Sequence, residues 1–221
     1  MPVEAKTFTW TDVLSTPLGP VSCNLRSSLP LVPGTDDLSR VSGGLLIRLE
    51  SFDLPTNWNQ GFYPDPLQID GGRCWRWFFE CVSENIARVD LHCGLDDISA
   101  AFWDAATGEN LAAVEYKLSG STLHIGTEDD QLLYGRTTYP EGGFPMRFKD
   151  ELGLPSPFSQ QLIELDRSGV NIHIPQLLIG EILYFHLLAA HVVDEQEGDS
   201  WLAVDRSKKD LDGWLLSASS Q

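Results

Sequence analysis

The stretch LAAVEYKLSGSTLHIG, residues 111–126, decides the fold class of this chain. Polar and apolar side chains alternate on both sides of a central Ser119-Gly120 pair. Alternation with a period of two is typical of a strand that buries one face, and Ser-Gly is a turn-forming dipeptide. The stretch therefore predicts two antiparallel strands, 111–118 and 121–126, joined by a tight turn.

Similar patterns extend the β prediction in both directions from this pair. We expect a strand at residues 100–105, so that three strands form a meander with its other turn at residues 107–110. Upstream, we expect a strand at residues 44–54 and a hairpin formed by residues 73–82 and 86–93 around residues 83–85. Downstream, we expect strands at residues 170–174, 181–193 and 201–205, with an acidic loop at residues 194–200.

Helical signals are fewer, and residues 36–41, 144–152 and 157–165 are the candidates. The segment 177–190 is ambiguous, because a short apolar run of Leu and Ala also suits a buried helix. We favour a strand there, since Ile182, Tyr184, Val192 and Val193 prefer strands. The expected fold is mainly β, an antiparallel sandwich or barrel-like sheet with a few short helices, in one globular domain spanning residues 1–221. The alternative is an α+β fold with a buried helix at residues 177–190.

The composition allows a sizeable core and gives the chain a strong negative charge. Of its 221 residues 42% are hydrophobic, so a chain of this size needs neither disulfides nor metal to fold. Thirty-two acidic residues against 15 basic ones give a formal net charge of −17. Such a surface repels nucleic-acid phosphates and anionic lipid headgroups, and it attracts basic proteins. We therefore expect a basic protein partner, and neither nucleic-acid nor membrane binding.

Several features predict a cytoplasmic protein with reduced thiols. Residues 1–6 lack the basic start and apolar run of a secretory signal. The most apolar segment, residues 177–193, is interrupted by Glu181 and two histidines and is too short to span a bilayer comfortably. Four cysteines in a chain of this length do not form a small secreted disulfide framework.

Standard catalytic motifs are missing from the sequence. It contains no G-x-x-x-x-G-K-S/T loop, no G-x-G-x-x-G after a strand, no H-E-x-x-H and no G-x-S-x-G. This excludes the easily recognised nucleotide hydrolases, dinucleotide enzymes, zincins and α/β-hydrolases. We expect no cofactor, and the pattern favours a non-enzymatic protein without excluding an enzyme with dispersed catalytic groups.

Four of the five histidines lie between apolar neighbours. On strands, the imidazoles of His92, His124, His173 and His186 would point away from those neighbours. If the strands were adjacent, His92, His124 and His173 would be candidate metal ligands or acid–base groups. Histidines on the half-exposed face of a sheet give the same pattern without a site, and we favour that interpretation. We therefore predict no metal site.

The relative positions of three cysteine side chains follow from the predicted hairpin. A turn centred on residue 84 would set Cys74 almost opposite Cys93, where a contact or a disulfide is geometrically feasible. Cys81 has the other parity and should face away from Cys74. The favoured interpretation is four buried, inert thiols.

Acidic residues are concentrated in one part of the chain. From Asp90 to Asp130, 41 residues include nine acids and Lys117 as the only base, so they carry −8 of the total −17. Most of these acids lie at turns of the predicted meander, and several are expected to share one edge of the sheet. The predicted partner-binding residues are Asp96, Asp97, Asp104, Glu109, Glu128, Asp129, Asp130 and Trp103.

Aromatic residues are the other ingredient of a protein interface, because they often form its hot spots. Two long loops, residues 55–72 and 137–145, carry several of them. Trp58 and Tyr63 are additional candidate anchors, although aromatic loops are more often lids packed on a core.

An acidic domain without catalytic motifs has the composition of bacterial immunity proteins and small inhibitors, which cover the active site of a basic nuclease or toxin. We therefore expect a non-enzymatic protein-binding module that neutralises a basic effector. The alternative is a β-barrel or sandwich that holds a small ligand or metal, with lyase or hydrolase activity. A third, weaker hypothesis is a DNA mimic whose carboxylates imitate phosphates.

Overall fold

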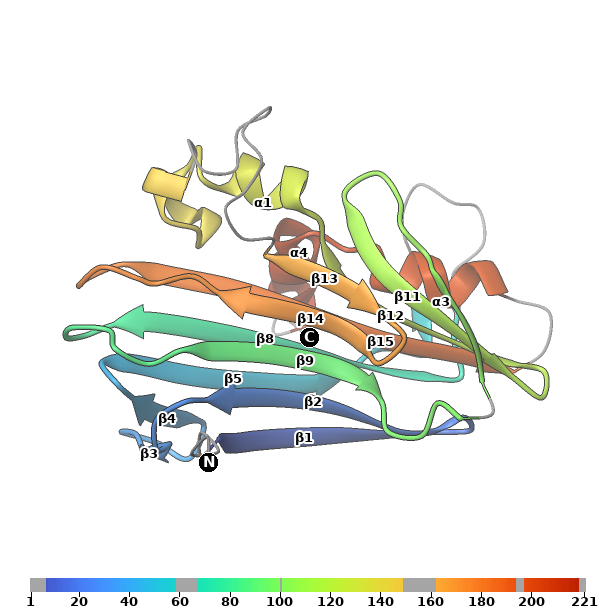
Figure 1. The fold of residues 1–221 in the computed structure, drawn as a ribbon. Helices are drawn as coiled ribbons and strands as arrows, with labels where there is room; N and C mark the ends of the chain where they lie inside the picture. Colours follow the sequence, from blue (N-terminus) through green and yellow to red (C-terminus); the bar gives the residue numbers. More distant parts are fainter. Residues whose placement is uncertain (1–6, 59–66, 100, 149–161, 194–196, 219–221) are drawn as a thin grey trace.

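The computed structural model describes residues 7–58, 67–99, 101–148, 162–193 and 197–218. Most of them lie in two antiparallel sheets, which confirms the mainly β fold and its sandwich form (Figure 1). In spatial order, the five-stranded sheet consists of β1 (Phe8–Thr16), β2 (Gly19–Ser27), β9 (Val89–Leu95), β14 (Gly169–Ile174) and β13 (Ile163–Asp166).

The second sheet contains the predicted meander at one edge. In spatial order its eight strands are β10 (Phe102–Ala105), β11 (Leu111–Leu118), β12 (Ser121–Glu128), β15 (Ile182–Val193), β8 (Gly71–Cys81), β5 (Leu45–Asp53), β4 (Ser39–Ser42) and β3 (Val32–Pro33). Ser119 and Gly120 have φ of 52° and 79°, the positive values that a two-residue hairpin turn requires. A separate small pair is formed by β6 (Asn57–Trp58) and β7 (Leu67–Gln68).

The main core lies between the two sheets. Leu25 of β2 and Leu91 of β9 meet Trp77 of β8 and Phe185 of β15 there, and all four side chains are fully buried. Trp77 also packs edge-to-face against Trp10 of β1, with ring centroids 5.4 Å apart. Burial of such large aromatic and aliphatic groups is the dominant stabilising term for a sandwich.

Strand β15 resolves the ambiguity at residues 177–190. Leu183, Phe185 and Leu187 face the inter-sheet core, whereas Leu188 and Ala190 belong to a second core on the outer face of the eight-stranded sheet. Because both faces of the strand are buried, its sequence is continuously apolar and loses the alternation of a half-exposed strand. The alternative of a buried helix is wrong.

The predicted hairpin of residues 73–82 and 86–93 is also wrong, although both strands exist. β8 lies between β15 and β5 in one sheet, and β9 lies between β2 and β14 in the other. Both edges of β8 are therefore already paired. The chain after β8 docks on Gly43-Gly44 instead of turning, with Val82 and Ile86 donating backbone N–H groups to the carbonyls of Gly44 and Gly43. Gly44 has φ of 91°, and a Cβ there would lie 2.2 Å from the Glu84 carbonyl oxygen.

The helices differ from the predicted ones. Residues 39–41 of the predicted helix 36–41 lie in β4, and the predicted strand 201–205 lies mostly in a helix. Among the described residues, the helices are α1 (Asp130–Arg136), α3 (Glu197–Val204), α4 (Lys208–Ala218) and the 3-10 turns η1 (Pro140–Gly142) and η2 (Met146–Phe148). The predicted helix 144–152 is reduced to η2 within the described residues, and 149–152 lie outside them. Of 157–165, residues 157–161 lie outside them and 163–165 are in β13.

Helices α3 and α4 cover the outer face of the eight-stranded sheet (Figure 1). Ala203 and Val204 of α3 and Leu211 of α4 pack there against Leu188 and Ala190. A capping box begins α4: the Ser207 N–H donates to the Asp210 carboxylate, and the Asp210 N–H donates to the Ser207 hydroxyl. Within the described residues, these and the other helices are too short or too polar to cross a membrane.

Candidate functional site

The exposed acids of the meander gather around its outermost strand. Asp96 and Asp97 follow β9 on the path to β10, Asp104 lies on β10, and Glu109 lies in the turn between β10 and β11, all exposed to solvent. Asp129 and Asp130 are half-buried at the start of α1. We call these six residues the acidic edge. The Ser99 N–H that donates to the Asp97 carboxylate lowers its pKa, so this group is charged at neutral pH.

β10 is an edge strand, paired only with β11 among the described strands. Phe102 lies opposite Lys117 and is 61% exposed. Trp103 lies opposite Tyr116 and is partly buried against the inter-sheet core. This residue, which was predicted to anchor a partner, therefore contributes mainly to the stability of the fold. Phe102 is thus the more exposed of the two aromatic side chains on β10. Sequence reasoning missed it because Phe102 and Trp103 are adjacent and their orientation depends on the register.

The turn before β11 brings the far end of the acidic edge together. The Asp129 N–H donates to the Asn110 carbonyl at 3.0 Å, which fixes the end of β12 beside the turn that carries Glu109. The Asp129 carboxylate accepts the Leu132 N–H at 2.9 Å and caps α1. These contacts place Glu109, Asp129 and Asp130 near one end of β10, whereas Asp96 and Asp97 precede its other end.

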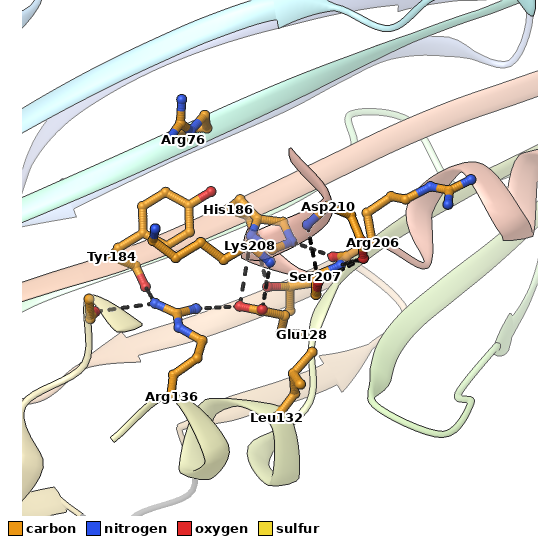
Figure 2. A network of polar contacts seen from close by, with 12 residues as sticks. Arg76, Glu128, Leu132, Arg136, Tyr184, His186, Arg206, Ser207, Lys208 and Asp210 are labelled. Atoms are coloured by element: carbon orange, nitrogen blue, oxygen red, sulfur yellow. Dashed lines mark hydrogen bonds and ion pairs between the residues drawn. The ribbon is translucent and has the colours of Figure 1, made fainter. Parts of the chain in front are cut away.

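Glu128 differs from the other predicted partner-binding residues because its side chain lies inside the protein, 2% exposed. It pairs with the guanidinium of Arg136, which is 1% exposed, and accepts the Lys208 N–H at 2.8 Å (Figure 2). We therefore leave Glu128 out of the acidic edge. A buried carboxylate of this kind is stabilised by its partners and not offered to the surface.

Arg136 joins four parts of the chain through its guanidinium. It pairs with Glu128 on β12, donates to the Gly142 carbonyl at 2.6 Å and donates to the Tyr184 carbonyl on β15 at 2.6 Å. The guanidinium also lies 5.0 Å from the Tyr184 ring centroid. With the Lys208 N–H on the same carboxylate, the network fixes α1 and the start of α4 onto the sheet.

His186 is fully buried in the same network. Its Nε2 lies 2.9 Å from the Arg206 carbonyl, so this nitrogen must donate and carry the proton. Nδ1 then lies 3.8 Å from a Glu128 carboxylate oxygen. Burial lowers the pKa of His186 against the raising effect of Glu128, and the imidazole is neutral.

A hollow of about 420 Å³ shares Lys208 with this network. Its described lining residues are Tyr139, Glu141, Lys208, Lys209 and Asp212. The Lys208 ammonium lies 2.5 Å from Asp212, which also accepts from Arg76 at 2.8 Å. The charges of this hollow are therefore largely compensated internally and do not define one class of ligand.

The three candidate histidine ligands do not converge. His92 and His173 lie on β9 and β14 of the five-stranded sheet, whereas His124 lies on β12 of the other sheet. His124 Nδ1 is 2.9 Å from the hydroxyl of Ser200, a residue of α3. No trio of His, Cys, Asp or Glu in the described part of the chain has the arrangement of a metal site.

His92 and His173 belong instead to a polar ladder on the outer face of the five-stranded sheet. His92 Nδ1 lies 2.9 Å from the Asn171 side-chain oxygen, and His173 Nδ1 lies 2.7 Å from an Asp90 oxygen. Partial burial lowers the pKa of His173, but Asp90 and Glu164 outweigh it and the net shift is upward. This is the half-exposed arrangement favoured from the sequence.

The four cysteines are buried free thiols. Cys93 lies opposite Cys23 on β2 and not opposite Cys74, because β8 and β9 belong to different sheets. Cys74 faces the outer core and Cys81 faces the inter-sheet core, so the expectation that they face opposite ways is confirmed. The proposed contact between Cys74 and Cys93 is wrong.

The aromatic loop at residues 55–72 contributes nothing to the site that can be described. Tyr63 and Phe62 lie outside the described residues, and so does the side chain of Trp58. In the loop at 137–145, Tyr139 is 42% exposed beside the hollow, whereas Phe144 is buried.

Comparisons of the chain with protein-family models, with curated proteins and with solved structures find no match.

Proposed function

We propose that the chain is a binding module for a basic protein, which docks on the acidic edge. The observation that carries the proposal is the cluster of exposed carboxylates around the edge strand β10. Lys117, the only base between Asp90 and Asp130 in the sequence, lies opposite Phe102 and pairs with Glu115 at 3.2 Å. Arg167, between β13 and β14, donates to the Ile98 carbonyl at 3.1 Å and brings one further base to the Asp96–Asp97 end. The six acids of the acidic edge still outnumber these two bases.

The charge of the acidic edge acts mainly on the rate at which the two proteins associate. At physiological salt the Debye length is about 8 Å, so only carboxylates close to the approaching surface contribute strongly. Because the acids of the acidic edge flank one short strand, several of them can lie close to a partner that docks on β10. Complementary charge can raise an association rate constant from about 10⁶ to 10⁸ M⁻¹s⁻¹ or more at low salt.

Affinity needs contacts beyond charge, and β10 offers two kinds. No described strand pairs with its outer edge, so an extended segment of a partner can add there, although the Ala105 N–H already donates to the Asp104 carboxylate at 2.8 Å. Phe102, which is 61% exposed on the same strand, can be buried by such a partner. Acidic steering and an aromatic contact on an open strand together form a small, specific interface.

Within this function, we propose an inhibitor or immunity protein that neutralises a basic effector such as a toxin. The strong acidity of the chain and its missing catalytic motifs favour that class. A basic active site that binds nucleic acid is the natural complement of an acidic edge.

The test is a capture experiment with matched variants. The wild-type chain is immobilised beside D96N/D97N/D104N/E109Q, which neutralises four exposed acids of the acidic edge. The control D36N/D37N/E80Q/E84Q neutralises four exposed acids elsewhere, with Asp36 and Asp37 between β3 and β4 at the opposite edge of the same sheet. Proteins from the source organism are captured, identified and purified, and their affinities are measured by calorimetry.

We expect a basic protein that binds the wild type and the control alike and the acidic-edge variant about tenfold more weakly. An affinity that falls equally in both variants would mean that only net charge matters. Recovery of no basic protein would contradict the proposal.

A further inference from the structure

Two of the buried thiols lie directly opposite each other on neighbouring strands (Figure 1). Cys23 of β2 and Cys93 of β9 are Cα partners in the antiparallel ladder of the five-stranded sheet, and both side chains are fully buried in the inter-sheet core. Residues directly opposite each other in an antiparallel pair have their side chains on the same face of the sheet. The two sulfurs are therefore neighbours, although 70 positions separate the residues in the sequence.

The hydrogen bonds of the β2–β9 ladder show which kind of pair this is. At one end the Asp96 N–H donates to the Pro20 carbonyl at 3.0 Å, and at the other the Ser28 N–H donates to the Arg88 carbonyl at 2.9 Å. Both hydrogen-bonded positions have even numbers on β2. Hydrogen-bonded pairs alternate with non-hydrogen-bonded pairs along an antiparallel ladder, so the cysteine pair, at an odd position of β2, is non-hydrogen-bonded.

The spacing of such a pair suits a disulfide. Opposite residues of a non-hydrogen-bonded pair have Cα atoms about 4.5 Å apart, which lies within the range of about 4.4–6.8 Å that disulfides require. The Trp77 indole N–H donates to the Cys23 sulfur at 3.4 Å and holds it within the core. Burial first, and then the neighbouring Cys23 thiol, raise the pKa of Cys93. The backbone therefore already holds the two sulfurs in position for a bond.

The other two thiols are poor competitors for either sulfur. Cys74 faces the outer core, so the eight-stranded sheet separates it from the inter-sheet core. The Cys81 thiol is engaged at the end of β8, where it donates to the Ser83 carbonyl at 3.0 Å and lies 3.4 Å from the Leu177 carbonyl. The fold therefore favours one pairing among the four cysteines.

We infer that Cys23 and Cys93 are a latent cross-strand disulfide, which closes when the chain folds in the presence of a low-molecular-weight disulfide such as oxidised glutathione. The thiolate of one cysteine attacks the glutathione disulfide, forms a mixed disulfide and releases one glutathione thiolate. The thiolate of the other cysteine attacks the protein sulfur of the mixed disulfide, closes the cross-strand bond and releases the second glutathione thiolate. The two protons lost by the cysteines end on the two glutathione thiols, so the protein loses two electrons and glutathione gains them.

The closed bond gives the chain a second, more stable form. Both sulfurs are shielded in the native protein, so the bond forms before the core is complete, and the folded reduced chain reacts only when it opens. Once formed, the bond ties β2 to β9 and restricts the unfolded chain over the long segment between the two cysteines, which favours the folded state. An oxidising environment thus produces a stapled protein that resists unfolding.

The experiment is oxidative refolding of the full chain. The reduced protein is unfolded in urea, refolded in glutathione buffers with an increasing oxidised fraction, trapped with iodoacetamide and mapped by mass spectrometry. We expect one dominant disulfide, between Cys23 and Cys93, with Cys74 and Cys81 alkylated. C74S/C81S should form the same bond, and its equilibrium constant with glutathione should be about 100-fold lower when urea keeps the chain unfolded. C23S/C93S is the matched control and should form no disulfide.

Oxidised C74S/C81S should also unfold about 10 °C above its reduced form. Equal unfolding temperatures of the two forms would overturn the inferred staple. A mixture of pairings, a dominant bond that involves Cys74 or Cys81, or a wild-type chain that folds but stays reduced at the most oxidising glutathione ratio would overturn the inferred pair. The wild-type peptide map decides the pairing even where a variant does not fold.

Discussion

The carboxylate of Glu128 and the guanidinium of Arg136 form an ion pair inside the protein, with side chains 2% and 1% exposed. The pair holds β12 to α1, and further bonds of the same two groups reach the Lys208 N–H and the Tyr184 carbonyl. It therefore fixes the segment that begins at Asp129, at one end of the acidic edge. The buried pair supports the proposed surface without belonging to it.

Arg136→Met should lower the free energy of unfolding by about 3–5 kcal/mol, because it leaves the Glu128 carboxylate buried without its cation. E128Q/R136M should recover part of that loss, since the amide carries no charge. Urea unfolding measures both. Arg48→Gln, which breaks the exposed pair with Glu50, is the control and should cost less than about 1 kcal/mol. Equal costs for the two Arg variants would show that the Glu128–Arg136 pair is not buried.

His186 should remain a neutral Nε2–H tautomer when the pH is lowered to about 6, because burial lowers its pKa. Long-range ¹H–¹⁵N NMR distinguishes this tautomer from the imidazolium. The chain should also become less stable as the pH falls below the unfolded value of about 6.5, since only the unfolded His186 then takes up a proton. A protonated His186 in the folded protein at pH 6 would contradict the assigned network.

His173 should stabilise the protein in the opposite pH range. Its folded pKa is raised by Asp90 and Glu164, so its contribution is fully present below about pH 6.5 and is lost as the pH rises through the folded pKa. Compared with the wild type, His173→Gln should be less stable near pH 6, by up to about 1 kcal/mol, and nearly equal near pH 9.

His92→Gln is the matched control, because burial lowers the pKa of His92 despite its hydrogen bond with Asn171. Its stability relative to the wild type should change with pH in the opposite direction. Parallel pH profiles for the two variants would contradict the assigned contacts of both histidines.

The four thiols should be unreactive in the native protein. Each cysteine is buried, and burial raises the pKa of Cys74 and Cys93, which removes the reactive thiolate. A chromogenic disulfide reagent should therefore label four thiols only after unfolding. Rapid labelling of the native protein, or a disulfide between Cys74 and Cys93 in peptide maps, would contradict the separation of β8 and β9.

Features set by local chemistry were predictable from the sequence. The Ser119-Gly120 turn needs positive φ at both positions, and the alternation of Val114 and Tyr116 with Glu115 and Lys117 follows from an outer face that is only partly covered there. Residues 111–113 of the same strand are buried on both faces. The strand at residues 182–193 was predictable from its β-branched residues, although both of its faces are buried. The terminal helices were not, because Trp201 and Val204 suit either structure and only packing on the outer face decides.

Features set by pairing between distant strands were not predictable. The sequence from β8 to β9 has the local pattern of a hairpin. A hairpin is excluded because both edges of β8 are paired, one with β5 and the other with β15. The burial of Glu128 has the same origin. Its neighbours Asp129 and Asp130 are half-buried, and no local pattern indicates that Arg136 and the start of α4 enclose Glu128. The acidic edge was predictable as a charge density, but its arrangement around β10 was not.

The most direct test of the central claim is the association rate constant for the purified basic partner, measured by stopped flow as a function of salt. The account predicts that the rate constant of the wild type and of D36N/D37N/E80Q/E84Q falls steeply between about 50 and 300 mM salt. D96N/D97N/D104N/E109Q should associate about tenfold more slowly at low salt and show a flatter dependence. An association rate that is independent of salt, or equal in the two quadruple variants, would contradict docking on the acidic edge.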